Sequence, residues 1–394
     1  MHLSKRIQSI LGDGDDGWGV FYKARAMLRA GIDITELTIG EHDIGTDSSI
    51  LDAMHRAATR GHTGYADIAG VPALRDAVAT RLQARTGTPT SRENVLITPG
   101  GQAALFASHM AVCDEGDTAL FIDPHYATYP GTIRSVGARP LAIPTQSSRQ
   151  FQPDPDRLRA SAKGAKSLLI NSPNNPTGVV YSQDTMEGIA AVCRHEDLWL
   201  ISDEVYDGQV WQGAHLSPRA LPGMAERTLV VGSMSKSHAM TGSRVGWVVG
   251  PAPVIEAAEN LAINTTYGVP GFIQDAALFA LRQGIAFEQK IAAPFCRRRA
   301  AAAAVFKDQD TVRLIPSGGA MYLMLDIRAT GLSGEAFALR LLEEQHIAVM
   351  PGESFGRAAA GHLRVAMTVE DTRFLDALER LIRFAQMIRK DPIR

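Results

Sequence analysis

One lysine in this chain stands in a setting that suits chemistry better than solubility. Lys236 lies among small and hydroxyl residues in the segment 233–244, and the chain has only eight lysines against thirty-two arginines. A lysine removed from water has a lower pKa, and its neutral amine can form a Schiff base with a carbonyl. The hydroxyls of Ser233 and Ser235 and the guanidinium of Arg244 can hold a phosphate. An aldehyde and a phosphate on one ligand together indicate pyridoxal 5′-phosphate.

The same segment also permits two other interpretations. A single lysine is usually a solvated surface group. Ser233 and Lys236 also form the S-x-x-K pattern of penicillin-binding proteins and β-lactamases. Those enzymes need S-D-N and K-T-G sequences as well, and neither 202–204 nor 240–242 supplies one. No apolar segment long enough for a secretory leader follows the N-terminus, so we set the second interpretation aside.

Three predicted strands each end in a cluster of polar residues. The apolar run 167–171 leads into a turn that contains Asn175. The run 198–202 leads into Asp203, and the run 228–232 leads into the segment that contains Lys236. In open α/β sheets, ligands bind just beyond the carboxyl ends of the strands. We therefore expect the three clusters to meet in one crevice.

The order and spacing of these residues resemble the class I and II aminotransferases, pyridoxal-phosphate enzymes of fold type I in the aspartate aminotransferase superfamily. Asp203 follows Asn175 by 28 residues, Tyr206 follows Asp203 by three, and Arg244 follows Lys236 by eight, as in that family. The resemblance implies pyridoxal 5′-phosphate as the cofactor, and an amino acid and a 2-oxo acid as substrates in a ping-pong cycle.

The resemblance covers nearly the whole chain, from 37–41 to 363–366. It implies an α/β fold with a seven-stranded, mostly parallel sheet in a large domain and a smaller α/β domain beside it. Within the family, the greatest likeness is to arginine–pyruvate transaminases, and it is carried by the segments 203–206, 221–225, 235–242 and 359–362.

The resemblance also implies roles for the residues around the cofactor ring. Lys236 would hold the cofactor covalently and then act as general base and acid. Asp203 would keep the ring nitrogen protonated, because a nearby carboxylate favours the charged form. Tyr206 and Asn175 would hydrogen-bond the phenolic oxygen of the ring. Tyr126 would stack on the ring.

The phosphate would be held at the start of a helix. Gly101 and Gln102 precede a helical pattern, and the backbone N–H groups of a helix N-terminus bind anions. The family resemblance adds three side chains that would complete this phosphate site, namely Ser233, Ser235 and Arg244.

The substrate and a second subunit would meet the remaining residues. Arg364 matches the arginine that binds the substrate carboxylate as a bidentate fork, with Gly40 and Asn175 beside the substrate. Tyr65 matches a tyrosine that reaches the phosphate from the neighbouring subunit. This match implies a homodimer with shared active sites.

Several positions depart from the family pattern. His42 replaces a usual proline and Ser243 a usual tryptophan, and we expect neither to touch the chemistry. Some aspartate-specific relatives carry a lysine where Gln102 stands. Others use an arginine from the partner subunit, and the segment 264–272 contains no arginine. Dicarboxylate substrates are therefore disfavoured.

An acidic, glycine-rich segment near the N-terminus suggests a basic substrate. In this family the N-terminal segment lies over the mouth of the active site. Asp13, Asp15 and Asp16 could attract a guanidinium or ammonium group, and Trp18 could stack on it. We hypothesise that arginine or another long basic amino acid is the preferred donor, with pyruvate as acceptor. An ordinary solvated turn, with Asp13 capping the following helix, is the alternative.

Two other functional classes stay open at this stage. A pyridoxal-phosphate β-eliminating lyase would use the same fold and most of the same residues. A non-catalytic regulator would carry an appended DNA-binding domain, and only 36 residues precede the segment that begins at Leu37.

Composition limits the setting in which the protein works. The 394 residues carry a net charge of −2, so neither nucleic acid nor a membrane surface is an expected partner, and no apolar run is long enough to span a bilayer. Three cysteines without metal-ligand spacing indicate a reducing compartment, and we expect a cytoplasmic protein.

Strand patterns alternate with helical patterns from about residue 94 to residue 250, which indicates a mostly parallel sheet covered on both faces. We expect a large cofactor-binding domain at 46–284. A small domain at 285–394 would be completed by the N-terminal segment 1–45.

Overall fold

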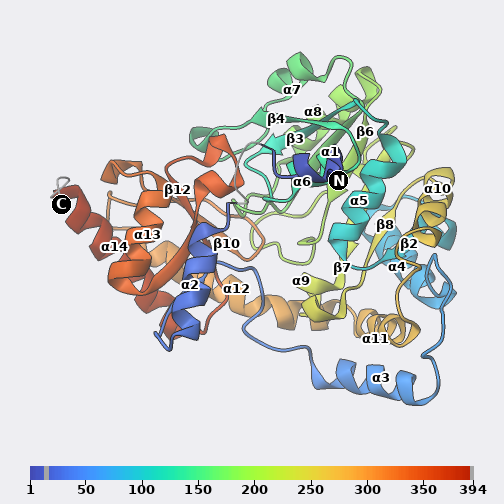
Figure 1. Ribbon diagram of the computed structural model, residues 1–394, viewed down its shortest axis with the longest axis horizontal. Coiled ribbons are helices and arrows are strands. Elements are labelled where there is room, and N and C mark those ends of the chain that lie inside the picture. Colours follow the sequence, from blue (N-terminus) through green and yellow to red (C-terminus); the bar gives the residue numbers. More distant parts are fainter. Residues whose placement is uncertain (13–16, 391–394) are drawn as a thin grey trace.

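The computed structural model describes residues 1–12 and 17–390 of the chain, which fold around two β-sheets (Figure 1). The larger sheet has seven strands in the order β2-β8-β7-β6-β5-β3-β4, and all neighbours are parallel except at β8, which runs antiparallel to β2 and β7. The predicted fold class, a seven-stranded and mostly parallel sheet beside a smaller α/β unit, is confirmed. The strands are β2 (Val95–Thr98), β3 (Thr118–Asp123), β4 (Arg139–Pro144), β5 (Ser167–Asn171), β6 (Trp199–Asp203), β7 (Thr228–Ser233) and β8 (Gly246–Val249).

The central strands of this sheet are apolar along their whole length because helices cover both faces. In β5, Leu168 faces one layer of helices and Leu169 faces the other, since successive side chains of a strand point to opposite faces. The helices around this sheet are α3 (Ser48–Thr59), α4 (Pro72–Thr86), α5 (Gly101–Val112), α6 (Tyr129–Ser135), α7 (Pro155–Ala162), α8 (Gln183–His195), α9 (Met234–Ser237), α10 (Ala252–Ile263) and α11 (Gly271–Arg282).

The smaller sheet has five strands in the order β1-β11-β12-β10-β9. It is antiparallel except for β1, which pairs in parallel with β11, so that Thr35 lies opposite Ile347. Its strands are β1 (Thr35–Leu37), β9 (Arg313–Ile315), β10 (Tyr322–Asp326), β11 (Ile347–Pro351) and β12 (His362–Ala366), and its helices are α2 (Gly19–Arg29), α12 (Ile285–Val305), α13 (Gly334–Gln345) and α14 (Asp371–Lys390).

The N-terminal segment contributes to both parts of the molecule. Helix α2 and strand β1 pack into the five-stranded part, while the short helix α1 (Lys5–Ser9) contacts α6 beside the seven-stranded sheet. The division of the chain into domains at 45 and 285 stays a prediction.

The order of the strands brings the three polar clusters together. Strands β5, β6 and β7 are neighbours, with Asn171 opposite Asp203 and Asp203 opposite Val231. Their carboxyl ends therefore lie at one edge of the sheet, and this edge faces the five-stranded part (Figure 1). In the described part of the chain, none of the helices combines the length and the apolar character that spanning a bilayer requires.

Candidate active site

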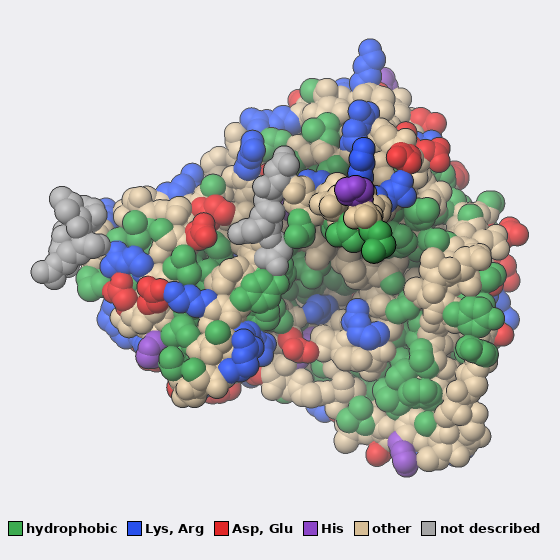
Figure 2. Space-filling model, in the orientation of Figure 1, with side chains coloured by type: hydrophobic (Ala, Val, Ile, Leu, Met, Phe, Trp, Pro, Cys, Tyr) green, Lys and Arg blue, Asp and Glu red, His purple; other side chains and the backbone are tan. Residues whose placement is uncertain are grey.

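A pocket of about 290 Å³ lies at the carboxyl ends of β5, β6 and β7. Figure 2 shows the hollow between the two parts of the molecule, with lysine or arginine side chains inside it. Twelve of the thirteen residues predicted for the site line this pocket, and Tyr65 is the exception. The twelve are Gly40, Gly101, Gln102, Tyr126, Asn175, Asp203, Tyr206, Ser233, Ser235, Lys236, Arg244 and Arg364.

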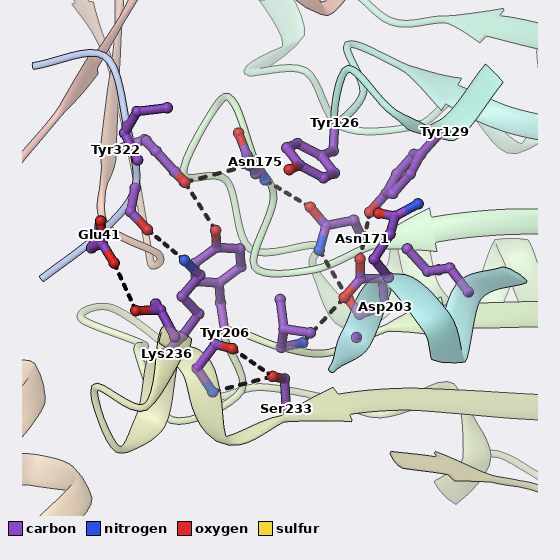
Figure 3. A pocket seen from close by; sticks show the side chains of 18 of the residues that line it. Glu41, Tyr126, Tyr129, Asn171, Asn175, Asp203, Tyr206, Ser233, Lys236 and Tyr322 are labelled. Atoms are coloured by element: carbon purple, nitrogen blue, oxygen red, sulfur yellow. Dashed lines mark hydrogen bonds between the residues drawn. The ribbon is translucent and has the colours of Figure 1, made fainter. Parts of the chain in front are cut away.

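Lys236 reaches the pocket from α9, the short helix that follows β7. Its Nζ donates a hydrogen bond to the backbone carbonyl of Gly40, on the segment that crosses between the two sheets (Figure 3). Burial, together with the charges of Arg364 and Arg244, lowers the pKa of the Lys236 amine to about 8, although the charge of Glu41 acts to raise it. A larger fraction of this amine is therefore neutral at physiological pH than for an ordinary lysine, as a nucleophile or base requires.

Asp203 lies at the last position of β6 and is almost fully buried. One carboxylate oxygen accepts a hydrogen bond from the hydroxyl of Tyr129 at 2.7 Å, and the other accepts the backbone N–H of Val205 at 3.3 Å. Burial raises the pKa of Asp203 to about 6, even though these two hydrogen bonds act to lower it. A cationic partner in the pocket would lower that pKa again. Tyr129 was not predicted as a site residue, although it follows the predicted Tyr126 by three positions.

Arg364 is a fully buried guanidinium without an acidic partner among the described residues. Its Nη1 donates to Oδ1 of Asn175 at 3.0 Å, its Nη2 donates to the carbonyl of Thr38, and its Nε has no hydrogen-bond partner. The rings of Tyr322 and Phe355 lie 4.6 and 4.3 Å from its central carbon. Burying a charge without an opposite charge is costly, so this arginine fits a site for an anionic ligand.

Asn175 and Tyr206 lie close together at the base of the pocket, as predicted. The backbone N–H of Asn175 donates to Oδ1 of Asn171 at 2.7 Å, which fixes the turn after β5. The hydroxyl of Tyr206 lies 3.0 Å from that of Tyr322, a residue of the five-stranded sheet (Figure 3). Tyr322 and Asn171 line the pocket but were missed in our sequence analysis.

The proposed phosphate end of the pocket is built around the first turn of α5. Gly100 precedes this helix with φ of 83°, a conformation that favours glycine. A side chain on Gly246 would strike the backbone of Gly100, so the close approach of β8 to this turn requires glycine there. The hydroxyls of Ser233 and Ser235 hydrogen-bond each other at 3.0 Å nearby. Backbone donors at the helix start and two hydroxyls can together accept an anion.

Arg244 adds a cation to this end of the pocket. Its guanidinium lies beside Gly100, where an added Cβ would come within 2.4 Å of it, and its Nη1 donates to the carbonyl of Thr241 at 2.8 Å. No carboxylate pairs with it among the residues that the structure describes. A doubly charged phosphate would satisfy this arginine together with the helix start.

Gln102 and Tyr126 line the wall of the pocket. The side chain of Gln102 is held by α6, because its Nε2 donates to Thr132 at 2.7 Å and its Oε1 accepts from Thr128 at 3.0 Å. The ring of Tyr126 packs edge-on against Tyr129 at 5.9 Å, which places it near Asp203. Trp18 also lines the pocket.

Two predictions concern residues outside this pocket or outside the described chain. Tyr65 is 90% exposed and packs edge-on against Tyr267, so its predicted contact with the phosphate would need a second subunit. Asp13, Asp15 and Asp16 lie outside the described residues.

His42 does not line the pocket, and the expectation that it stays away from the chemistry remains a prediction. Its imidazole is buried, and its ring centroid lies 5.2 Å from that of Phe295. Burial, together with the charge of Lys236, lowers the pKa of His42 to about 4. The imidazole is therefore neutral at physiological pH and does not add a charge next to the lysine.

The class of protein follows from four features of the pocket. They are an amine with a lowered pKa (Lys236), a buried carboxylate (Asp203), an anion site at the start of α5, and a buried guanidinium without an acidic partner among the described residues (Arg364). The chain belongs to the class I and II aminotransferases, whose family profile matches residues 32–381. Enzymes of this family use pyridoxal 5′-phosphate and transfer amino groups between amino acids and 2-oxo acids.

Individual relatives agree with this assignment over almost their full length. The chain is 39% identical to the arginine–pyruvate transaminase AruH of Pseudomonas aeruginosa, covering 97% of each chain, and 35% identical to the aspartate/prephenate aminotransferase of Thermus thermophilus, covering 97% and 98%. The solved structure of the Thermus thermophilus aspartate aminotransferase with maleate superposes with a TM-score of 0.91 at 34% identity, covering 98% of this chain and all of the other.

These relatives are aminotransferases, and neither a lyase nor a regulator is among them. The residues of the pocket also fit the cofactor of the family. Arg244, beside the start of α5, is suited to bind the phosphate of the cofactor. Asp203 is suited to bind its ring nitrogen, and the buried amine of Lys236 is suited to react with its aldehyde.

Proposed function

We propose that this aminotransferase takes arginine, or another long basic or neutral amino acid, as its donor and pyruvate as its acceptor. The observation that carries the proposal is the number of cations in the pocket. Among the described residues that line it, only Lys236, Arg244 and Arg364 are cationic. The cofactor would engage the first two and the substrate α-carboxylate the third, so no cation remains for a second carboxylate on the substrate.

The mouth of the pocket supports a basic side chain. Glu41 lines it and accepts a hydrogen bond from Thr241 at 2.7 Å, and Trp18 lines it as well. A carboxylate and an indole ring are suitable partners for a guanidinium. The likeness to an arginine–pyruvate transaminase supports the same substrates.

In this proposal the residues of the site divide the work of the reaction. When bound, pyridoxal 5′-phosphate supplies an aldehyde for the amino group and an electron-withdrawing ring. Lys236 would hold the cofactor and then accept the α-proton of the amino acid. Asp203 would hold a proton at the ring nitrogen, and Tyr206 and Asn175 would donate to the ring oxygen. Arg364 fixes the substrate carboxylate, so that the α-hydrogen lies near the lysine amine.

The remaining roles follow the same division. The phosphate would be held by Gly101, Gln102, Ser233, Ser235 and Arg244. Tyr126 would stack on the ring. The backbone of Gly40 would lie beside the substrate. Its carbonyl accepts a hydrogen bond from the amine of Lys236.

A comparison of four amino donors with pyruvate tests the substrate proposal. We expect kcat/KM to fall in the order arginine, norleucine, alanine, aspartate, with arginine at least about tenfold above norleucine because a guanidinium gains charge-assisted contacts of roughly 1–3 kcal/mol. Formation of the oxo acid is the measurement. Equal values for arginine and norleucine would exclude recognition of the charge, and preference for aspartate would contradict the argument from the pocket's cations.

We also propose a homodimer in which Tyr65 of one subunit contacts the phosphate bound by the other. The support is the exposure of Tyr65 and Tyr267, which pack together on the surface. Tyr65→Phe should weaken cofactor binding about tenfold, by loss of one hydrogen bond to a charged group, without changing sedimentation as a dimer. His55→Gln, on α3, serves as a surface control. A monomer in sedimentation equilibrium, or unchanged cofactor affinity, would contradict the proposal.

A cytoplasmic location completes the proposal. Its support is the state of the three cysteines, because Cys113 and Cys193 are buried as free thiols and Cys296 is an exposed free thiol. Free thiols of this kind are typical of a reducing compartment.

A further inference from the structure

Tyr322 belongs to the five-stranded sheet, but its side chain reaches the pocket at the edge of the seven-stranded sheet. It begins β10 and is 2% exposed. In the antiparallel pair of β10 and β12, Met324 lies opposite Arg364. Tyr322 is two residues before Met324, so its side chain shares a face with that of Arg364. The ring of Tyr322 accordingly lies 4.6 Å from the guanidinium carbon.

The hydroxyl of Tyr322 contacts the residues that we assign to the ring oxygen of the cofactor. It accepts a hydrogen bond from Nδ2 of Asn175 at 3.4 Å and lies 3.0 Å from the hydroxyl of Tyr206 (Figure 3). It also packs directly on the backbone of Gly40, where an added Cβ would lie 1.8 Å from the hydroxyl oxygen. The position of the Tyr322 hydroxyl therefore leaves no room for a side chain at position 40, so that only glycine fits there.

The donors and acceptors of these four side chains allow a hydrogen-bond chain that runs in one direction. Arg364 has only donors, so its Nη1 must donate to Oδ1 of Asn175. That contact turns the amide so that Nδ2 of Asn175 donates to Tyr322. The hydroxyl hydrogen of Tyr322 is then available for the oxygen of Tyr206, and the hydrogen of Tyr206 is left to donate into the pocket.

We propose that Tyr322 is a positioning residue, the middle link of a hydrogen-bond chain that runs from Arg364 through Asn175 to Tyr206. The inference rests on the proposed roles of Arg364 and Tyr206. Aligned hydrogen bonds polarise one another, so a carboxylate on Arg364 changes how strongly Tyr206 donates at the other end. The aromatic face of Tyr322 has a second effect. It packs against the guanidinium of Arg364 and so restricts the positions of the group that would bind the substrate carboxylate.

Two variants separate the hydroxyl from the ring. Tyr322→Phe removes the link and keeps the aromatic face over Arg364, whereas Tyr322→Leu removes both. Tyr181→Phe is the matched control, because Tyr181 is equally buried but does not line the pocket. The probe is propionate, a carboxylate without an amino group.

The measurement is the pH midpoint of the absorption change of the bound cofactor, with and without saturating propionate. In the wild-type protein propionate should raise the midpoint, because it offsets the charge of Arg364. In Tyr322→Phe the propionate-induced shift should fall to half or less, and the midpoint without propionate should rise by about half a pH unit, since Tyr206 becomes a weaker donor. Tyr181→Phe should behave as the wild type does.

Propionate binding gives an independent readout for the ring. Its dissociation constant should change less than about twofold in Tyr322→Phe and rise roughly tenfold in Tyr322→Leu. If the phenylalanine variant does not fold, 3-fluorotyrosine introduced at position 322 keeps the shape and strengthens the donor. The midpoint without propionate should then move down.

The outcomes distinguish this inference from the proposed function. A wild-type midpoint that propionate does not move would overturn the assignment of Arg364 to the carboxylate, and the chain with it. A normal wild-type shift that persists in full in Tyr322→Phe, or a fluorotyrosine variant with an unchanged midpoint, would overturn the role of Tyr322 alone.

Discussion

Replacing Lys236 with alanine is expected to lower the turnover number by roughly four orders of magnitude or more, because one amine would serve both as the attachment point and as the base at the substrate. The variant should still bind pyridoxal 5′-phosphate through Arg244 and the start of α5. Lys290→Ala is a suitable control, since Lys290 lies on the surface and pairs with Asp47 at 3.7 Å. The turnover assay with the best amino donor is the measurement.

Two chemical readouts check the same residue without measuring turnover. Borohydride reduction of the wild-type protein should fix the cofactor to the peptide that contains Lys236. The apoprotein should take up the cofactor faster as the pH rises toward 8 and level off above it, because the pKa of the amine is lowered to about 8 and only the neutral amine attacks. Labelling at another lysine, or a rate that still climbs near pH 10, would contradict the assignment.

Asp203→Asn is expected to slow the half-reaction with an amino donor by about three orders of magnitude. The amide keeps the shape of the carboxylate but removes the charge that holds a proton on the ring nitrogen, and each pKa unit lost there corresponds to about 1.4 kcal/mol. Single-turnover absorbance changes measure the rate. Tyr129→Phe tests the supporting hydrogen bond and should cost about tenfold.

A charged cofactor analogue provides the decisive control for Asp203. An analogue with a fixed positive charge on the ring nitrogen should restore part of the rate in Asp203→Asn, because it supplies the charge that the variant cannot hold. An unchanged single-turnover rate in the variant, or no rescue by the analogue, would indicate that Asp203 has a structural role only.

The parts of the site that follow strand ends could be predicted from the sequence. Asn175, Asp203 and Lys236 each follow a continuous apolar run, and such runs indicate strands buried on both faces of a parallel sheet. The carboxyl ends of neighbouring parallel strands share one edge, so the convergence of these residues needed only the order of the strands. Arg364 came from the family resemblance, since nothing in its local pattern distinguishes it from the other arginines.

The contacts made across the two sheets could not be predicted in this way. Tyr322 stands in an apolar strand where an aromatic residue normally means core packing, and its hydroxyl partners come from a sheet that begins more than two hundred residues earlier. The burial of His42 could not be predicted either, because its segment has no periodic pattern that shows where it turns. Its burial beside Lys236 depends on α12, which supplies Phe295.

The pairing of β1 with β11 has a consequence for the synthesis of the protein. Thr35 finds its partner in Ile347, about 310 residues later. At translation rates of about 5–20 residues per second, the first strand waits roughly 15–60 s on the ribosome before its partner emerges. A three-residue strand is a small exposed edge, which limits association between nascent chains during that delay. The seven-stranded sheet, complete by residue 249, can form meanwhile and give the late part of the chain a surface on which to assemble.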